Sequence, residues 1–315
     1  MRGHARTGEG DVKGLVLSGG GGRGAYEYGV YSALADRGIA FDVISGTSVG
    51  AITAAFIASG VEHARIEALW RAMGAFRVAQ PRSDVWTLPR WTNLLDTRPL
   101  RRFLEDNLDL EAVRTSPTQL RFTAVDVDTG ELTVFRNRDV TIDHLLASSA
   151  IPILFPMVEV DGRHYWDGGA VANTPIGPAI EAGATEIYTV LLSPMASKPL
   201  TPPENLWEAI TRLSELRMLG NLKEDIKQAK AVNRIIARGF ADPNWRHVDF
   251  HVISPSDGLG LLTMLNFSPT KAAHLISRGR EDGLAYLGRG EQESALEEVA
   301  DAEQREDMRA RRGRV

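Results

Sequence analysis

The stretch that decides the fold is Phe41–Gly60, which reads FDVISGTSVGAITAAFIASG. It opens with a short apolar run typical of a buried strand and continues, from residue 51, as a helix of small residues. Between the two lies the pentapeptide GTSVG, whose glycines, Gly46 and Gly50, permit a tight turn from strand to helix. A G-x-S-x-G turn in this context predicts a nucleophile elbow, which holds the Ser48 hydroxyl at the carboxyl end of the strand. Tight glycine and serine turns also occur without chemistry, so the pentapeptide alone leaves both interpretations open.

The run Val43–Val61 contains no charged residue and approaches the length of a membrane-spanning helix. It also holds several glycines and hydroxyl residues, and it changes abruptly from strand-like to helix-like character. We therefore expect a buried strand followed by a buried helix.

A second apolar strand, Gly14–Ser18, lies upstream and ends in the glycine-rich loop GGGGRG at Gly19–Gly24, after which Ala25–Asp36 reads as a helix. Strand, loop, helix, strand and helix in this order predict an α/β domain with a parallel sheet. Further strands are predicted at 120–127, 132–135, 157–160, 164–166, 186–192 and 250–253, and further helices at 62–73, 98–107, 142–149, 176–182, 204–238 and 270–287.

The glycine-rich loop has two interpretations. A G-x-G-x-x-G pattern between a strand and a helix is typical of dinucleotide-binding domains, in which Asp42 would hold the ribose. In the other interpretation the loop is an oxyanion loop, whose bare backbone N–H groups point at a developing alkoxide. Asp42 precedes the apolar part of its strand and that strand leads into the serine elbow, and both facts favour the oxyanion loop. Arg23 either fixes the loop or meets an anionic head group.

A serine nucleophile needs a base within hydrogen-bonding reach. Asp167 ends a predicted hairpin strand and is followed by Gly168 and Gly169, a pattern that is also a common structural turn. His251 would complete the chain order Ser, Asp, His of the α/β-hydrolases, but it falls inside a predicted strand. None of the seven histidines stands in metal-ligand spacing and there is no cysteine, so we expect no metal site and no cofactor.

The composition and the N-terminal sequence limit the kinds of binding partner and the cellular compartment that we expect. The formal net charge of −5 argues against nucleic acid as a partner. The polar N-terminus lacks the apolar segment of a secretory signal, and the absence of cysteine fits a reducing compartment. We therefore expect a cytoplasmic protein, peripheral to a membrane if it meets one. Trp86, Leu88 and Trp91, in a stretch predicted to be irregular, either contact lipid or pack on the domain surface.

Four ordered segments carry a resemblance to a known family. They read LSGGGGRGAYEYGV at Leu17–Val30, ISGTSVGAI at Ile44–Ile52, ASSAIPILFP at Ala147–Pro156 and YWDGGAVANTPI at Tyr165–Ile176. Together they closely resemble the patatin-like phospholipases, over about residues 13–192. The resemblance implies an α/β fold, a three-layer α/β/α sandwich with a mainly parallel central sheet.

The resemblance also implies a site and an activity. Ser48 would be the nucleophile and Asp167 the base of a dyad, in an enzyme that hydrolyses carboxylic esters of phospholipids or related lipids through an acyl-enzyme. Its partner would be lipid at a membrane or micelle surface, and a protein activator would be a further partner. A non-catalytic lipid-binding protein and a dinucleotide-binding oxidoreductase are the alternatives. The implied oxyanion-hole residues are Gly19, Gly20, Gly21, Gly22, Arg23 and Gly24, and the implied supporting glycines are Gly46, Gly50, Gly168 and Gly169.

We expect one domain at 13–290, between a disordered lead at 1–12 and a charged flexible tail at 291–315. It consists of a motif-bearing core at 13–192 and a mostly helical part at 204–290. The long helix predicted at 204–238 has apolar residues at helical spacing, which predicts that it covers the core. These residues are Leu206, Ile210, Leu213, Leu216 and Leu219.

Overall fold

A computed structural model describes most of the chain. The described residues are 11–74, 78–82, 92–194, 202–204, 206–240, 242, 245–256, 259 and 266–289. Most of the predicted lead, the predicted tail and the three candidate lipid-contacting residues Trp86, Leu88 and Trp91 lie outside these ranges.

The core of the described structure is an eight-stranded sheet with the order β10-β9-β1-β2-β5-β8-β7, in which β6 also pairs with β5. Strands β10, β9, β1, β2 and β5 run parallel, and β6, β8 and β7 add antiparallel pairs at one side. The predicted mainly parallel sheet is therefore confirmed. The strands are β1 (Lys13–Leu17), β2 (Val43–Thr47), β5 (Gln119–Asp126), β6 (Leu132–Arg136), β7 (Val158–Val160), β8 (Arg163–Asp167), β9 (Glu186–Val190) and β10 (Asp249–Ile253).

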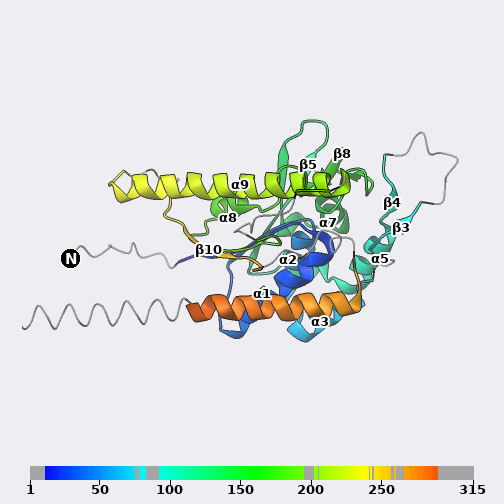
Figure 1. Cartoon of the computed structure of the whole chain (residues 1–315), viewed down its shortest axis with the longest axis horizontal. Helices are drawn as coiled ribbons and strands as arrows, with labels where there is room; N and C mark the ends of the chain where they lie inside the picture. The colour runs from blue at the N-terminus through cyan, green and yellow to red at the C-terminus, as the bar shows by residue number, and fades with distance from the viewer. Residues whose placement is uncertain are drawn as a thin grey trace, which may run out of the picture.

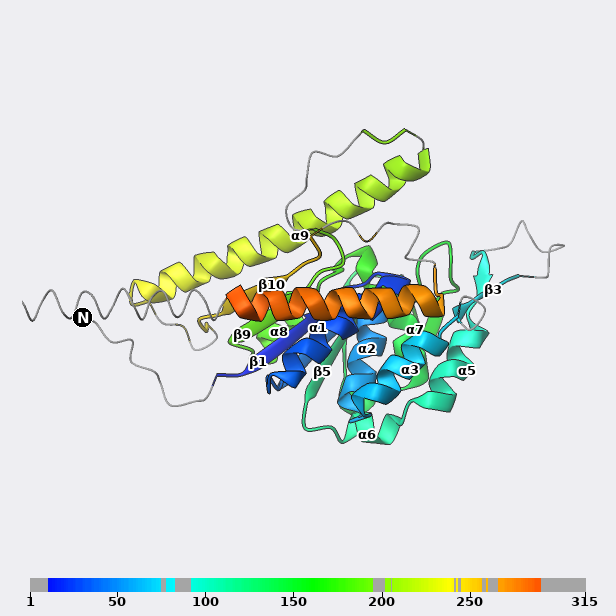
Figure 2. The same cartoon turned by 60° about the horizontal axis from the view of Figure 1, so that its bottom comes forward.

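Helices cover both faces of this sheet, as Figures 1 and 2 show. Side chains alternate along a strand, so Leu15 and Leu17 of β1 pack against one helical layer while Val16 packs against the other. The first layer contains α1, α2 and a helix at 269–289, and the second contains α8 and α9. The three-layer sandwich is thus confirmed. The helices are α1 (Gly24–Asp36), α2 (Val49–Ala58), α3 (His63–Ala72), α5 (Arg98–Asn107), α6 (Leu110–Arg114), α7 (Ile142–Ser148), α8 (Ile176–Glu181) and α9 (Leu206–Ala237).

Two short features of the described structure were not predicted from the sequence. The short helix α6 was not predicted, because five residues are too few to establish a helical period. The stretch expected to be irregular contains a small antiparallel pair, β3 (Gln80–Pro81) with β4 (Leu95–Asp96).

The long helix α9 covers the core only in part. Leu222 and Ile226 are buried in the second layer, but Leu213 is 69% exposed and Leu216 is 52% exposed. The expectation that these two residues cover the core is therefore wrong. A helix of 32 residues is about 48 Å long, whereas a five-residue strand spans only about 17 Å, so α9 overhangs the sheet. Figure 2 shows its N-terminal end rising away from the sheet.

The uncharged run Val43–Val61 forms β2 and α2, as predicted. Nowhere in the described ranges does a helix combine the length and the apolar character that crossing a membrane requires.

Candidate active site

The elbow lies between β2 and α2, with Ser48 as the residue of the turn. Its φ of 58° is unfavourable for a residue with a side chain, so the backbone is strained at this position. Close packing around the turn explains the two glycines. A Cβ at Gly46 would lie 2.6 Å from the Gly50 carbonyl oxygen, and one at Gly50 would lie 2.5 Å from the Leu17 carbonyl oxygen. The glycines therefore allow the close approach, while Ser48 itself takes the strained conformation.

Hydrogen bonds from distant elements hold the elbow in place. The Ser48 N–H donates to the Ser148 hydroxyl of α7 at 3.0 Å. Beside it, the Thr47 hydroxyl lies 2.7 Å from the Thr123 hydroxyl of β5 and 3.1 Å from the Ala172 carbonyl oxygen. Hydrogen bonds therefore hold the turn to α7, to β5 and to the loop that contains Ala172. The side chain of Ser48 is 5% exposed.

Strand β5 brings Asp167 to the level of Ser48. Thr47 of β2 pairs with Thr123, and Asp167 of β8 pairs with the next residue, Ala124. The strands that carry the two residues are about 10 Å apart, two strand spacings, and the two side chains bridge this distance. The Ser48 hydroxyl lies within hydrogen-bonding reach of the Asp167 carboxylate.

The environment of Asp167 makes it a better base than an ordinary aspartate. Burial raises its pKa to about 6, against the opposing effects of hydrogen bonds from the Ser48 hydroxyl and the Gly169 N–H. The Gly169 bond is 2.7 Å long and ends on Oδ1. A Cβ at Gly168 would lie 2.3 Å from the Thr123 hydroxyl, so only glycine fits directly after the aspartate. A carboxylate with this pKa can accept a proton near neutral pH.

Asn173 connects the glycine-rich loop to the site that contains Ser48 and Asp167. The Gly19 N–H donates to the Asn173 carbonyl oxygen at 3.0 Å, and the Asn173 side-chain amide donates to the Gly19 carbonyl oxygen at 3.2 Å. A Cβ at Gly19 would lie 3.2 Å from the Ser48 Cβ. The side-chain oxygen of Asn173 also lies 2.9 Å from the position of a Cβ at Gly169. Asn173 thus joins the loop before α1 to the loop after Asp167.

Two buried ionisable side chains contact the glycine-rich loop and the residue before it. Arg23 is 4% exposed and donates to the Gly20 carbonyl oxygen at 3.3 Å, which favours the interpretation that it fixes the loop. Glu27 is fully buried and accepts the Ser18 N–H at 2.5 Å. Burial raises the pKa of Glu27, against the effects of the Ser18 bond and the nearby Arg23.

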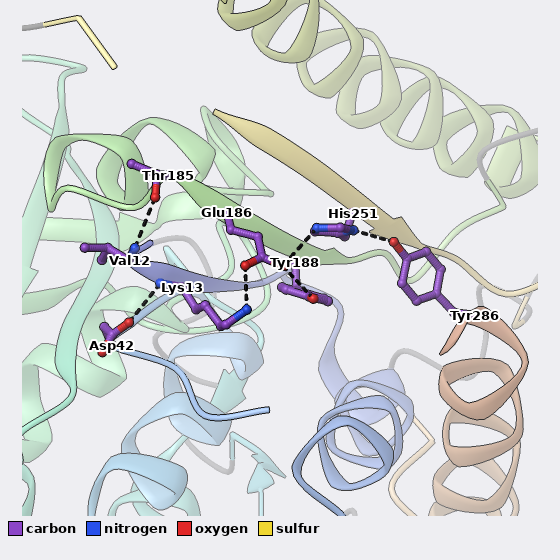
Figure 3. A network of polar contacts seen from close by, with 8 residues as sticks. All are labelled: Val12, Lys13, Asp42, Thr185, Glu186, Tyr188, His251 and Tyr286. Carbon is purple, nitrogen blue, oxygen red and sulfur yellow. Dashed lines mark hydrogen bonds and ion pairs between the residues drawn. The ribbon is translucent and has the colours of Figure 1, made fainter. Parts of the chain in front are cut away.

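The structure separates the remaining candidates from this cluster. Asp42 accepts the Lys13 N–H at 2.8 Å, at the amino end of β1, whereas the glycine-rich loop follows the carboxyl end of the same strand. His251 lies on β10, separated from β2 by β9 and β1. It is 3.2 Å from the Glu186 carboxylate and 2.5 Å from the Tyr286 hydroxyl (Figure 3). Neither residue belongs to the cluster around Ser48.

An apolar pocket opens beside Ser48, with a free volume of about 30 Å³. This volume is room for a few water molecules. Most of the walls are aliphatic or aromatic. The lining residues are Gly21, Ser48, Val49, Ile52, Met73, Val78, Leu100, Ser149, Ile151, Phe155 and Phe267.

Sequence reasoning missed Asn173, Ser148 and Glu27. All three stand inside the motif segments, and Glu27 is the only charged residue of α1 before its last residue, Asp36, which was the available signal. Their partners are 154, 100 and 9 residues away in the chain, so the contacts themselves follow from the tertiary structure.

The sequence of this chain is similar to those of several known proteins. The cGAMP-activated phospholipase of Pseudomonas aeruginosa is 31% identical over 182 residues, 51% of this chain and 53% of that protein. An NTE family protein of Mycobacterium tuberculosis is 30% identical over 171 residues, 54% of this chain and 28% of that protein. The chain therefore spans about half the length of the first relative and about a quarter of the second. The uncharacterized protein YqhO of Bacillus subtilis is 26% identical over 249 residues, 71% of this chain and 83% of YqhO.

The crystal structure of VipD from Legionella pneumophila superposes with a TM-score of 0.50 at 18% identity, covering 89% of this chain and 67% of VipD, which supports the fold alone. The sequence profile described as patatin-like phospholipase matches residues 15–180, more than half of the chain. That range includes the elbow, the glycine-rich loop and the Asp167 turn. The chain therefore belongs to the patatin-like phospholipase family.

Proposed function

We propose that this protein is a serine hydrolase that cleaves carboxylic esters of phospholipids or related lipids. The observation that carries the proposal is the buried Asp167 carboxylate within reach of the Ser48 hydroxyl, beside an apolar pocket. The names of the Pseudomonas relative and of the family support lipid as the substrate class.

In the proposed reaction Ser48 Oγ attacks the ester carbonyl carbon while Asp167 accepts the hydroxyl proton. The tetrahedral intermediate collapses to an acyl-enzyme, and the alcohol leaves with the proton held by Asp167. Water then attacks the acyl group, again giving its proton to Asp167, and the fatty acid is released. The proton finally returns to Ser48, so the enzyme ends as it began.

Backbone N–H groups would stabilise the negative charge on the carbonyl oxygen. Gly21 and Gly22 begin a short 3-10 turn, and Val49 begins α2. N–H groups at such positions have no partner within their own helix, so they are available to an oxyanion. The α2 N-terminus adds its partial positive charge.

The test is hydrolysis of p-nitrophenyl esters of graded acyl length by the intact chain, compared with Ser48→Ala and Asp167→Asn. We expect both variants to stay folded, by circular dichroism, and to lose activity by about 1,000-fold or more, because each removes a member of one catalytic unit. Full activity in Ser48→Ala would contradict the mechanism.

The name of the Pseudomonas relative describes it as activated by cGAMP. The assay therefore includes arms with and without that nucleotide. If the intact chain hydrolyses no ester in either arm while it binds lipid vesicles, the non-catalytic lipid-binding alternative is favoured.

A further inference from the structure

The segment between α7 and β7 carries an exposed apolar side chain between two residues that line the Ser48 pocket. Ile151 and Phe155 of this segment line the pocket. Ile153, midway between them, is 69% exposed. Leu94 contacts the same segment through its N–H, which donates to the Ile153 carbonyl oxygen at 2.9 Å, and it is 48% exposed. We call this pair the Leu94–Ile153 rim.

The backbone of Ile153 is strained. Its φ of 72° lies in the left-handed region, where a β-branched residue is a true outlier and glycine or asparagine is far better tolerated. Neighbouring hydrogen bonds hold this conformation. Besides the Leu94 bond, the Leu95 N–H donates to the Leu154 carbonyl oxygen at 2.9 Å and the Phe155 N–H donates to the Ile151 carbonyl oxygen at 2.8 Å. Packing does not explain the isoleucine, because most of its side chain faces solvent.

A polar cavity of about 370 Å³ lies next to the rim. Pro156, which directly follows the pocket residue Phe155, lines this cavity together with Arg82 and Arg98. Arg82 donates to Asn93, the residue before Leu94, at 3.2 Å. The side chain of Arg98 is 73% exposed and pairs at 2.5 Å with the carboxylate of Asp96, which also lines the cavity. Two guanidinium groups against one carboxylate give these described lining residues a net positive charge, so the rim and the cavity together suit an amphiphile with an acyl chain and an anionic head group.

We propose that the Leu94–Ile153 rim inserts into the surface of a lipid aggregate with anionic head groups, so that an acyl chain passes over Ile153 into the pocket at Ser48. The proposal rests on the proposed function and adds the surface by which the substrate arrives. Two aliphatic side chains are far too small a surface for a stable protein partner, which buries about 600 Å² or more on each side, but they suffice for contact with lipid. Strain retained at an exposed residue is itself typical of functional positions.

The test compares Ile153→Gly and Ile153→Asn with the unaltered chain. Both replacements relieve the strain, so we expect an equal or higher melting temperature. Both remove an apolar contact with lipid, so we expect co-sedimentation with phosphatidylglycerol-containing vesicles to weaken by about tenfold. We expect the ratio of the hydrolysis rate on these vesicles to the rate on a monomeric short-chain ester to fall by about tenfold as well. A residue with a merely structural role would not make the protein more stable and less able to bind lipid at once.

Two exposed positions serve as matched controls. Asp161 has a φ of 50° in the β7–β8 turn, so Asp161→Gly also relieves a left-handed backbone. Leu284, on the 269–289 helix, is 37% exposed, so Leu284→Ser also removes an exposed apolar side chain. Leu284→Ser is not expected to weaken vesicle binding, and neither is Asp161→Gly, because the loss of a carboxylate favours binding to anionic vesicles.

Vesicle binding unchanged in both Ile153 variants would overturn the proposal, and so would an equal loss in the controls. Because co-sedimentation needs no turnover, it tests the rim even in Ser48→Ala. A failure of the proposed function, which the ester assay detects, therefore stays distinguishable from a failure of the rim.

Discussion

Single residues take positions in this site that would be unfavourable elsewhere. Ser48 adopts a left-handed backbone conformation, and Asp167 is 5% exposed although an aspartate is ordinarily charged and solvated. The strained backbone of Ser48 and the burial of Asp167 both cost folding free energy. Together they place a hydroxyl and a carboxylate side by side, out of water. A buried carboxylate near a nucleophile is a candidate base because burial moves its pKa toward the working pH.

The raised pKa of Asp167 predicts the pH dependence of activity. The proposed base works as the carboxylate, so we expect kcat/KM on a monomeric ester to rise about tenfold per pH unit below about 6 and to level above it. Initial rates between pH 4.5 and 8.5 check this. A profile that falls as the pH rises through 6 would mean that the protonated acid is the active form.

The same shift predicts how the stability depends on pH. The folded-state pKa of about 6 lies above the unfolded value of about 3.9, so between these values the folded chain binds more protons than the unfolded chain. The free energy of unfolding therefore falls as the pH rises through this window, by about 3 kcal/mol in all. We expect Asp167→Asn to melt higher than the unaltered chain at pH 7.5, to lose about half of that advantage at pH 5 and to lose most of it at pH 4.

At the scale of elements, the described helix at 269–289 belongs to the core although it lies beyond the family match. It packs on α1 at a crossing where glycine faces backbone on both sides. A Cβ at Gly29 would lie 2.2 Å from the Ile276 carbonyl oxygen, and one at Gly279 would lie 2.1 Å from the Tyr26 carbonyl oxygen. Backbone atoms cannot yield as a flexible side chain does, so both positions require glycine at this helix spacing.

Two Gly-to-Ala changes, one at this crossing and one in the open on α9, are expected to have opposite effects. We expect Gly279→Ala to lower the free energy of unfolding by about 1–3 kcal/mol, because the added methyl group forces α1 and the last helix apart. Gly220, in the middle of α9, has open space around the position of a Cβ, so Gly220→Ala should raise the free energy of unfolding by about 0.5–1 kcal/mol through helix propensity. Urea denaturation of both variants measures the two effects. A Gly279→Ala variant as stable as the unaltered chain would contradict the close crossing.

At the scale of the whole molecule, the parallel sheet separates the two ends of its strands. The elbow, the glycine-rich loop and the Asp167 turn gather at one end. The opposite end carries the contacts among Lys13, Asp42 and Glu186 (Figure 3). Because the length of the strands separates the two ends, only residues at the same end can contact one ligand.

This separation predicts that the glycine-rich loop does not serve a dinucleotide. Asp42 and the loop lie at opposite ends of β1, which is about 17 Å long, so the acid cannot hold the ribose of a ligand whose pyrophosphate sits on the loop. We expect NAD and FAD at millimolar concentration to shift the melting temperature by less than about 1 °C. A shift that grows with ligand concentration would revive the oxidoreductase alternative.

Local patterns in the sequence determined most of the elements and the place of the elbow. Apolar runs and glycine turns are read over a few residues, which is why β1, α1, β2 and α2 were predicted close to their observed bounds. Only the tertiary structure decided that Asn173 joins two loops, that α9 overhangs the sheet and that Ile153 stands strained at the edge of the pocket. Each of these depends on contacts between residues far apart in the chain, or on the length of one element relative to another. No pattern within a short window of sequence records either quantity.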